Sequence, residues 1–86
     1  METITLANGR VFEGAHAIKS ENNLFVYITE GEYTLTEIVT LFENPENVRT
    51  ISADRYGEKT TYEGYTELYA VSKEYDNINL VLKKEV

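Results

Sequence analysis

The sequence predicts an α+β fold: a twisted antiparallel sheet of about six strands packed against one central helix, in the order βββ-α-βββ. Several segments alternate polar and apolar residues with the period of a half-buried strand. One central segment has helical spacing and opens on a capping motif. The turn signals between these segments are short, as an antiparallel sheet requires. Because the chain has 86 residues, 42% of them hydrophobic, we expect residues 1–86 to form a single domain.

Three strands are predicted before the helix: Glu2–Ala7, Arg10–Lys19 and Leu24–Thr29. Asn8-Gly9 follows the first strand and is a strong hairpin signal, because both central positions of a type I′ turn need a positive φ. We expect Gly14 to bend or bulge the second strand between Arg10–Glu13 and Ala15–Lys19.

The helix is predicted to begin at Thr34, where Thr34 and Glu37 have the spacing of a capping box. A core-facing stripe with i, i+3, i+4, i+7 spacing follows: Leu35, Ile38, Val39 and Phe42. Asn44-Pro45 should end the helix, because the residue before proline is disfavoured in helical geometry. Pro45 can also start one further turn, with Glu46 near its positive end.

Three more strands are predicted after the helix: Val48–Asp54, Lys59–Lys73 and Ile78–Lys84. We expect Gly64 to produce a bulge in the long middle strand, since glycine has no side chain to pack there. The sequence shows no internal repeat.

Several classes of protein are disfavoured by composition. The chain has no cysteine, which excludes disulfides, thiol nucleophiles and Cys-based zinc sites, and which fits a reducing cytoplasm. No apolar run approaches the roughly 20 residues of a membrane span, and the N-terminus lacks the pattern of a signal peptide. No glycine-rich phosphate loop is present, and we expect no cofactor.

Catalytic and metal sites are also weakly indicated. His16 is the only histidine and lies in no triad-like motif, so a structural or exposed role is favoured. Glu30 and Glu32 could bind calcium weakly, although a solvated acidic surface is the simpler interpretation. Glu63 and Glu67 could form a two-carboxylate catalytic site, but a position on the solvent-exposed face of a sheet explains these two residues equally well. We therefore predict that the protein is not an enzyme.

Charge is the strongest functional signal. The segment from Glu21 to Glu46 contains six glutamates and no lysine or arginine, and residues 1–46 carry −6 of the net charge of −7. This sign disfavours direct binding of nucleic acid, whose affinity depends on lysine and arginine. The hypothesis is a non-enzymatic module that binds a protein partner with a basic surface, such as a nucleic-acid-binding groove.

The predicted partner-binding residues are Tyr27, Glu30, Glu32, Tyr33, Glu43 and Glu46. Helix capping and turn preferences account least well for Glu30 and Glu43; Glu43 would even oppose the helix dipole. On a strand, Glu30 and Glu32 would be about 6.6–6.8 Å apart, near the spacing of successive phosphates. Two alternatives stay open: a solubilising acidic surface, and an assembly component that self-associates or docks through its sheet and tyrosine-rich strand.

Four segments together carry a resemblance: TITLANGRVFEG, FENPEN, YEGYTELYAVS and INLVLKK. In this layout the chain resembles small acidic proteins encoded by phages and prophages of gut-dwelling Gram-positive bacteria. The resemblance implies either a virion or tail-assembly protein, or an inhibitor of host defence, among which several anti-CRISPR proteins occupy nucleic-acid-binding surfaces. It carries no functional residue over to this chain.

Overall fold

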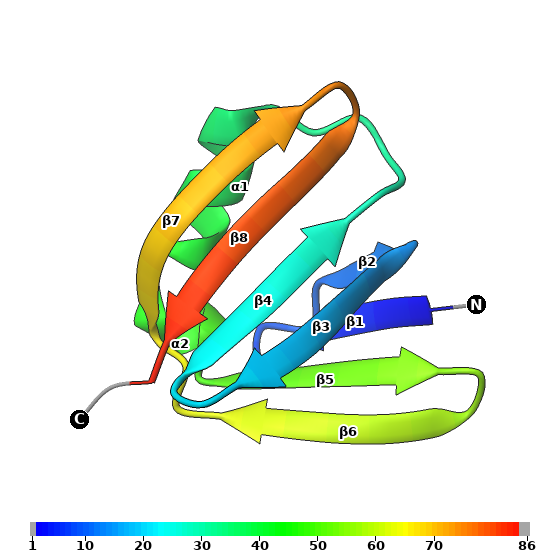
Figure 1. Ribbon diagram of the computed structural model, residues 1–86, viewed down its shortest axis with the longest axis vertical. Coiled ribbons are helices and arrows are strands. Elements are labelled where there is room, and N and C mark those ends of the chain that lie inside the picture. The colour runs from blue at the N-terminus through cyan, green and yellow to red at the C-terminus, as the bar shows by residue number, and fades with distance from the viewer. Residues whose placement is uncertain (1, 85–86) are drawn as a thin grey trace.

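The computed structural model describes residues 2–84, which form eight strands in two antiparallel four-stranded sheets (Figure 1). Two short helices lie between the fourth and the fifth strand of the chain. Sheet A has the strand order β2-β1-β5-β6 and contains β1 (Glu2–Leu6), β2 (Val11–Glu13), β5 (Thr50–Arg55) and β6 (Glu58–Glu63). Sheet B has the order β3-β4-β8-β7 and contains β3 (Ala15–Ser20), β4 (Asn23–Ile28), β7 (Glu67–Glu74) and β8 (Asn77–Lys83).

The predicted antiparallel pairing is confirmed, but the structure is mostly β, with two four-stranded sheets and two short helices, and the predicted α+β arrangement of one six-stranded sheet packed against one helix is wrong. The predicted strand Arg10–Lys19 is divided between β2 in sheet A and β3 in sheet B. The predicted strand Lys59–Lys73 is divided in the same way between β6 and β7. Both divisions fall at a glycine that we expected only to bulge a continuous strand.

Gly14 and Gly64 are the points where the chain leaves sheet A and enters sheet B. Their φ angles are +65° and +87°, a left-handed conformation that costs other residues more than it costs glycine. The amide of Gly14 donates to the carbonyl of Glu2 (2.9 Å), and the amide of Gly64 donates to the carbonyl of Arg49 (3.1 Å). Each crossing is thereby bonded to the start of a central strand of sheet A.

These matched crossings reveal a repeat in the topology. Strands β1–β4 and β5–β8 each form one hairpin in sheet A and then one hairpin in sheet B, and the two units meet at β1–β5 and β4–β8. The crossings carry similar tripeptides, Phe12-Glu13-Gly14 and Tyr62-Glu63-Gly64.

Helix α1 (Leu35–Phe42) begins as predicted, because the Thr34 hydroxyl oxygen accepts a hydrogen bond from the Glu37 amide (3.1 Å). Its predicted apolar stripe is confirmed in part: Ile38 and Phe42 are buried, whereas Leu35 is 39% exposed. The further turn expected at the proline exists as α2 (Pro45–Val48).

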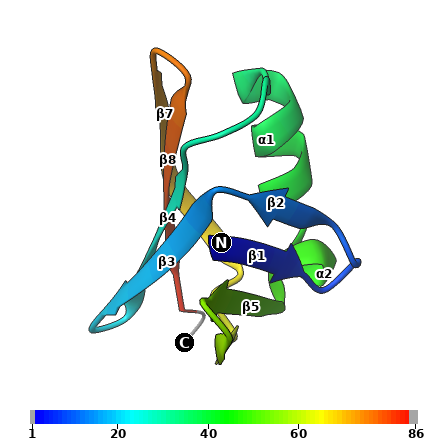
Figure 2. The same cartoon turned by 90° about the vertical axis from the view of Figure 1, so that its right-hand side faces the viewer.

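The core lies between the inner face of sheet B on one side and sheet A together with α1 on the other (Figure 2). Its buried residues are all hydrophobic or aromatic: Ile4, Leu6, Phe12, Ala15, Leu24, Val26, Ile28, Ile38, Phe42, Val48, Ile51, Tyr65, Ile78, Leu80 and Leu82. Phe12 of sheet A contacts both the helix and the loop before it, because the centroid of its ring lies 5.8 Å from that of Phe42 on α1 and 5.3 Å from that of Tyr33. On β4 the buried residues are Leu24, Val26 and Ile28, and on β8 they are Ile78, Leu80 and Leu82, which is the alternation expected of half-buried strands.

The predicted hairpin between β1 and β2 is present, but its type I′ turn is not. The Leu6 carbonyl accepts from the Gly9 amide (3.0 Å), and the Leu6 amide donates to the Arg10 carbonyl (2.9 Å), which closes a three-residue loop. Gly9 has a φ of +90°, whereas Asn8 is not among the residues with a positive φ. Three-residue loops of this kind need one left-handed residue rather than two.

Replacing Gly64 with alanine should lower the free energy of unfolding by about 1–2 kcal/mol, the cost of holding an L-residue in left-handed geometry. A Cβ at this position would meet only ordinary contacts, the nearest at 3.6 Å from Lys84, so the backbone conformation accounts for the effect. Urea denaturation measures the loss. The control is Gly64→Asn, which should lose less because asparagine tolerates this conformation better. Equal stability of the alanine variant and the parent would contradict the argument.

Candidate functional site

The segment between β4 and α1 carries Glu30, Gly31, Glu32 and Tyr33, the centre of the predicted partner-binding residues. It is a loop and not a strand, so the expected strand spacing of the two carboxylates is wrong. Gly31 has a φ of +102°, and the ring of Tyr33 lies over it, which leaves no room for a side chain at Gly31.

The fold places a third carboxylate, from strand β2, beside this loop. Glu13, on β2, lines one hollow of about 420 Å³ together with Val11, Glu30, Gly31 and Tyr33. The side chain of Glu30 also lies against Gly14, the residue where the chain crosses from sheet A to sheet B. We call Glu13, Glu30 and Glu32 the acidic loop surface. Sequence reasoning missed Glu13 because it precedes the run of glutamates and belongs to another sheet.

Two basic side chains approach this loop without pairing with its carboxylates. The guanidinium of Arg10 lies over the rings of Phe12 (5.3 Å) and Tyr33 (5.9 Å). The ammonium of Lys73 donates to the Tyr33 carbonyl (3.1 Å). Among residues 2–84, ion pairs form only at Glu2, so no ion pair of the described residues involves Glu13, Glu30 or Glu32.

The remaining acidic residues of the predicted site lie elsewhere. Glu43 is the C-cap of α1 and Glu46 is in the first turn of α2, about 12 Å along the helix from the loop. No basic residue occupies the last turn of α1, so the unfavourable position expected for Glu43 has no local compensation. Glu21 lies in the β3–β4 turn, at the opposite end of β4 from Glu30 (Figure 1). The six glutamates do not share one side of the molecule.

The two tyrosines among the predicted partner-binding residues, Tyr27 and Tyr33, also lie on opposite sides of sheet B. Tyr33 packs its ring against the buried Phe12 on the core side. Tyr27 alternates with the buried Val26 and Ile28, and therefore points away from the core. Its ring stacks on His16 of the neighbouring strand, with centroids 5.0 Å apart. The structure thus brings Tyr33 to the acidic loop surface but not Tyr27.

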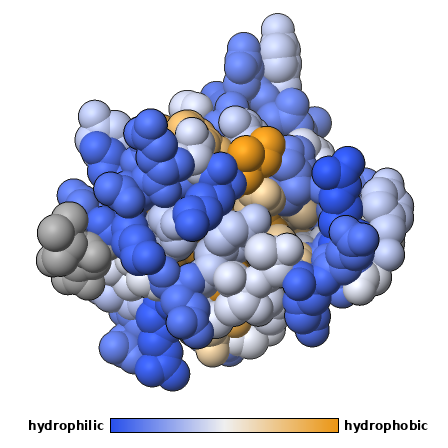
Figure 3. Space-filling model, turned by 60° about the horizontal axis from the view of Figure 1, so that its bottom comes forward, coloured by the Kyte–Doolittle hydropathy of each residue, from blue (hydrophilic) through white to orange (hydrophobic). Residues whose placement is uncertain are grey.

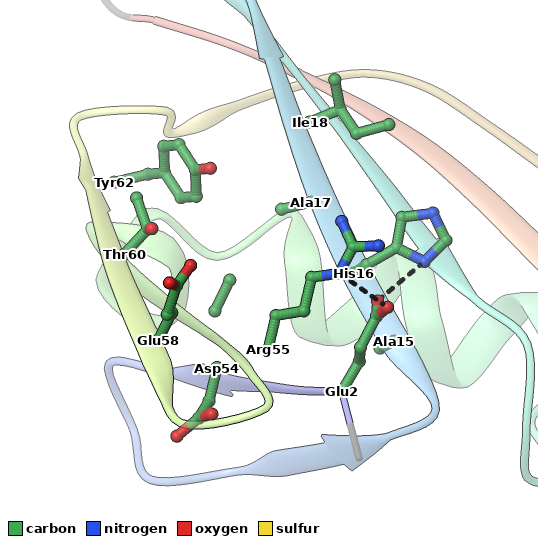
Figure 4. Close-up of a pocket in the computed structure, with 11 residues that line it drawn as sticks. Glu2, Ala15, His16, Ala17, Ile18, Asp54, Arg55, Glu58, Thr60 and Tyr62 are labelled. Atoms are coloured by element: carbon green, nitrogen blue, oxygen red, sulfur yellow. Dashed lines mark ion pairs between the residues drawn. The ribbon is translucent and has the colours of Figure 1, made fainter.

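A groove of about 410 Å³ lies between β3 and the strands β5 and β6 (Figure 4). On one side Glu2 pairs with Nε of Arg55 (3.3 Å) and with Nδ1 of His16 (3.5 Å); Thr60 and Tyr62 come from β6 on the other side. The Arg55 side chain is 75% exposed and that of His16 42%. Ion pairs so open to water contribute little to stability.

Topology explains why this groove exists. Helix α1 fills the space between β7 and β2, where it contacts β7 and packs Phe42 on Phe12. The equivalent space in the repeat, between β3 and β6, has no helix. There β3 packs directly against β1 and β5, and the groove is the space that remains between β3 and β6.

The described chain offers little else for chemistry. Residues 2–84 contain no group of three His, Asp or Glu side chains arranged to hold a metal ion. In the same residues, neither helix has the length and apolar character needed to cross a membrane. On the face shown in Figure 3, hydrophilic side chains surround a small pale and orange centre. Comparison with family models, curated proteins and solved structures finds no match for this chain.

Replacing Glu2 with glutamine should lower the free energy of unfolding by less than about 1 kcal/mol, because both of its partners are solvent-exposed. The loss should shrink further in 0.5 M NaCl, which screens exposed pairs. Glu58→Gln is the control, since Glu58 lines the same groove but forms no ion pair within the described chain. Chemical denaturation at both salt concentrations measures the difference. A loss of several kcal/mol would show that the groove is held together by this cluster.

Proposed function

We propose that this protein is a non-enzymatic, acidic protein-binding module that docks on a partner with a basic surface. The proposal is supported by one observation above all. Within residues 2–84, the carboxylates of the acidic loop surface form no ion pair, although Arg10 and Lys73 reach the same loop. A partner that supplies lysine or arginine there would gain charge-assisted hydrogen bonds without first breaking an internal ion pair.

Several contacts also fix the position of the loop through Tyr33. Tyr33 is held by the ring of Phe12, by the Arg10 guanidinium and by the Lys73 ammonium. A loop fixed in this way loses little conformational entropy on binding. Charge complementarity of this kind speeds association and selects partners more than it adds affinity. Glu43 and Glu46 belong to the proposal as a second acidic group, beyond the far end of α1.

The chemistry of such a partner suggests its class. Nucleic-acid-binding grooves present lysine and arginine in a spacing suited to phosphates. A small acidic domain that occupies such a groove would inhibit it, which is how the proposed phage-encoded inhibitor of host defence, including an anti-CRISPR protein, would work. Phage origin and a bacterial cytoplasm remain predictions.

The alternative function is a small virion or tail-assembly component that docks through its sheet. A specific observation favours keeping it: the outer face of sheet B is covered by no other element of the described chain (Figure 2). Docking through that face would depend on apolar contact and not on the carboxylates.

Charge reversal at the loop tests the proposal. A Glu30→Lys/Glu32→Lys variant should lose at least tenfold of its binding when the immobilised domain captures proteins from bacterial lysate in 50 mM NaCl. Capture by the unmodified domain should fall steeply in 500 mM NaCl, since screening weakens exposed charge pairs. A short DNA duplex added to the lysate should compete with the domain for the same proteins. Quantitative mass spectrometry of the captured proteins measures all three effects.

The matched control is Glu21→Lys/Glu58→Lys, which has the same net charge but places one lysine in the β3–β4 turn and the other at the start of β6. It should capture the same proteins as the unmodified domain. If both double variants lose binding equally, only the net charge matters and the loop is not the binding site. If neither loses binding, the charge mechanism is wrong and sheet-mediated docking gains support.

A further inference from the structure

The outer face of sheet B is covered by no other element of the described chain. Sheet A and α1 both pack on its inner face, and Figures 1 and 2 show the two helices behind sheet B in one view and to one side of it in the other. Side chains alternate along each strand, so every residue that follows a buried one on β4 or β8 points outward.

Apolar side chains form a row across this face. The pairing of the four strands places Ile18, Phe25, Val81 and Ala70 in register, one from each strand. Ile18 is 52% exposed, and Phe25 and Val81 are half-buried. Tyr69, at the bulge beside Ala70, is 63% exposed. Apolar side chains lined up across all four strands are typical of a face that packs against another surface.

The charge of this face differs from that of the rest of the molecule. Its charged side chains, with His16 neutral, are Lys83, Glu67 and Glu74, a net charge of −1 against −7 for the whole chain. The Lys83 ammonium lies 3.9 Å from the centroid of the Tyr69 ring, at the margin of the apolar row. Two copies of an acidic protein repel each other least when they meet through the face that carries the least charge.

We infer that the outer face of sheet B binds the same face of a second copy of this chain, forming a twofold symmetric dimer. Two such sheets would pack about 10 Å apart with the apolar rows in contact. In that arrangement the charged residues stay at the margins. The inference goes beyond the proposed function, because it uses neither the acidic loop surface nor a foreign partner.

The size of the face predicts a weak dimer. Four strands about 4.8 Å apart and about six residues long cover roughly 19 by 20 Å, or about 400 Å² of projected area. Stable interfaces bury about 800 Å² of accessible surface on each partner. We therefore expect dissociation in the micromolar range or weaker, with modest strengthening as salt screens the repulsion between two chains of −7.

Sedimentation equilibrium between 20 µM and 1 mM protein in 0.15 M NaCl tests the inference. The average mass should rise from 9.9 kDa toward twice that value. Ile18→Lys should weaken dimerisation at least tenfold, although it reduces the net charge and so reduces repulsion. Val81→Lys is a second variant at the centre of the row. The control is Val11→Lys on β2, where Val11 is 47% exposed but lies in sheet A; it should change dimerisation by less than twofold.

Because the chain has no cysteine, crosslinking gives an independent measurement. Phe25→Cys and Val81→Cys proteins, mixed and oxidised, should form covalent dimers faster than Val11→Cys. A protein that stays monomeric at 1 mM overturns the inference, as do equal effects of lysine at positions 11 and 18. Lysate capture by Ile18→Lys separates the two proposals, because charge-driven binding through the acidic loop surface should survive this substitution.

Discussion

The fold depends on the two places where the chain passes from sheet A to sheet B, at Gly14 and Gly64. Each crossing combines a left-handed backbone with a hydrogen bond from the glycine amide to the start of a central strand of sheet A. Only this change of direction allows short hairpins to build two sheets around one core. With continuous strands, the same residues would form one wide sheet with too little material to cover its apolar face.

The repeat that follows from these crossings is broken in one place, by the helices between the two units. Helix α1 covers part of the inner face of sheet B beside β7, whereas β3 closes directly on sheet A. This asymmetry has two consequences. It leaves the groove that holds Glu2, His16 and Arg55, and it produces the loop that carries Glu30 and Glu32. The groove and the loop therefore both follow from the path of the connection between the two units.

The two proposed surfaces lie in different parts of the structure and depend on different forces. The acidic loop surface carries carboxylates that form no ion pair within residues 2–84, and the binding proposed for it would be sensitive to salt. The outer face of sheet B holds apolar side chains with little charge, which suits a second copy. A dimer formed through sheet B would present two acidic loops, so that a partner with two basic sites would bind with increased avidity.

Local sequence patterns determined the elements whose signals lie within a few residues. The alternation in β4 and β8, the Thr34 cap and the turn at Pro45 follow from backbone geometry and side-chain periodicity, and the structure has them. The type of the first hairpin turn was decided by the register of β1 and β2, which Asn8-Gly9 alone does not specify. The role of the glutamates as a group likewise required the fold, because sequence neighbours such as Glu21 and Glu30 lie at opposite ends of one strand.

The sequence by itself determined the acidic charge, the inward faces of the strands and the position of the helix. Only the tertiary structure decided that Gly14 and Gly64 divide strands between two sheets, because a left-handed glycine serves equally well in a bulge and in a crossing. It also decided that Glu13 lies beside Glu30, that Tyr27 and Tyr33 face opposite sides of sheet B, and that no other element of the described chain covers the outer face of sheet B. Those outcomes depend on contacts between residues far apart in the chain, and local periodicity carries no information about such contacts.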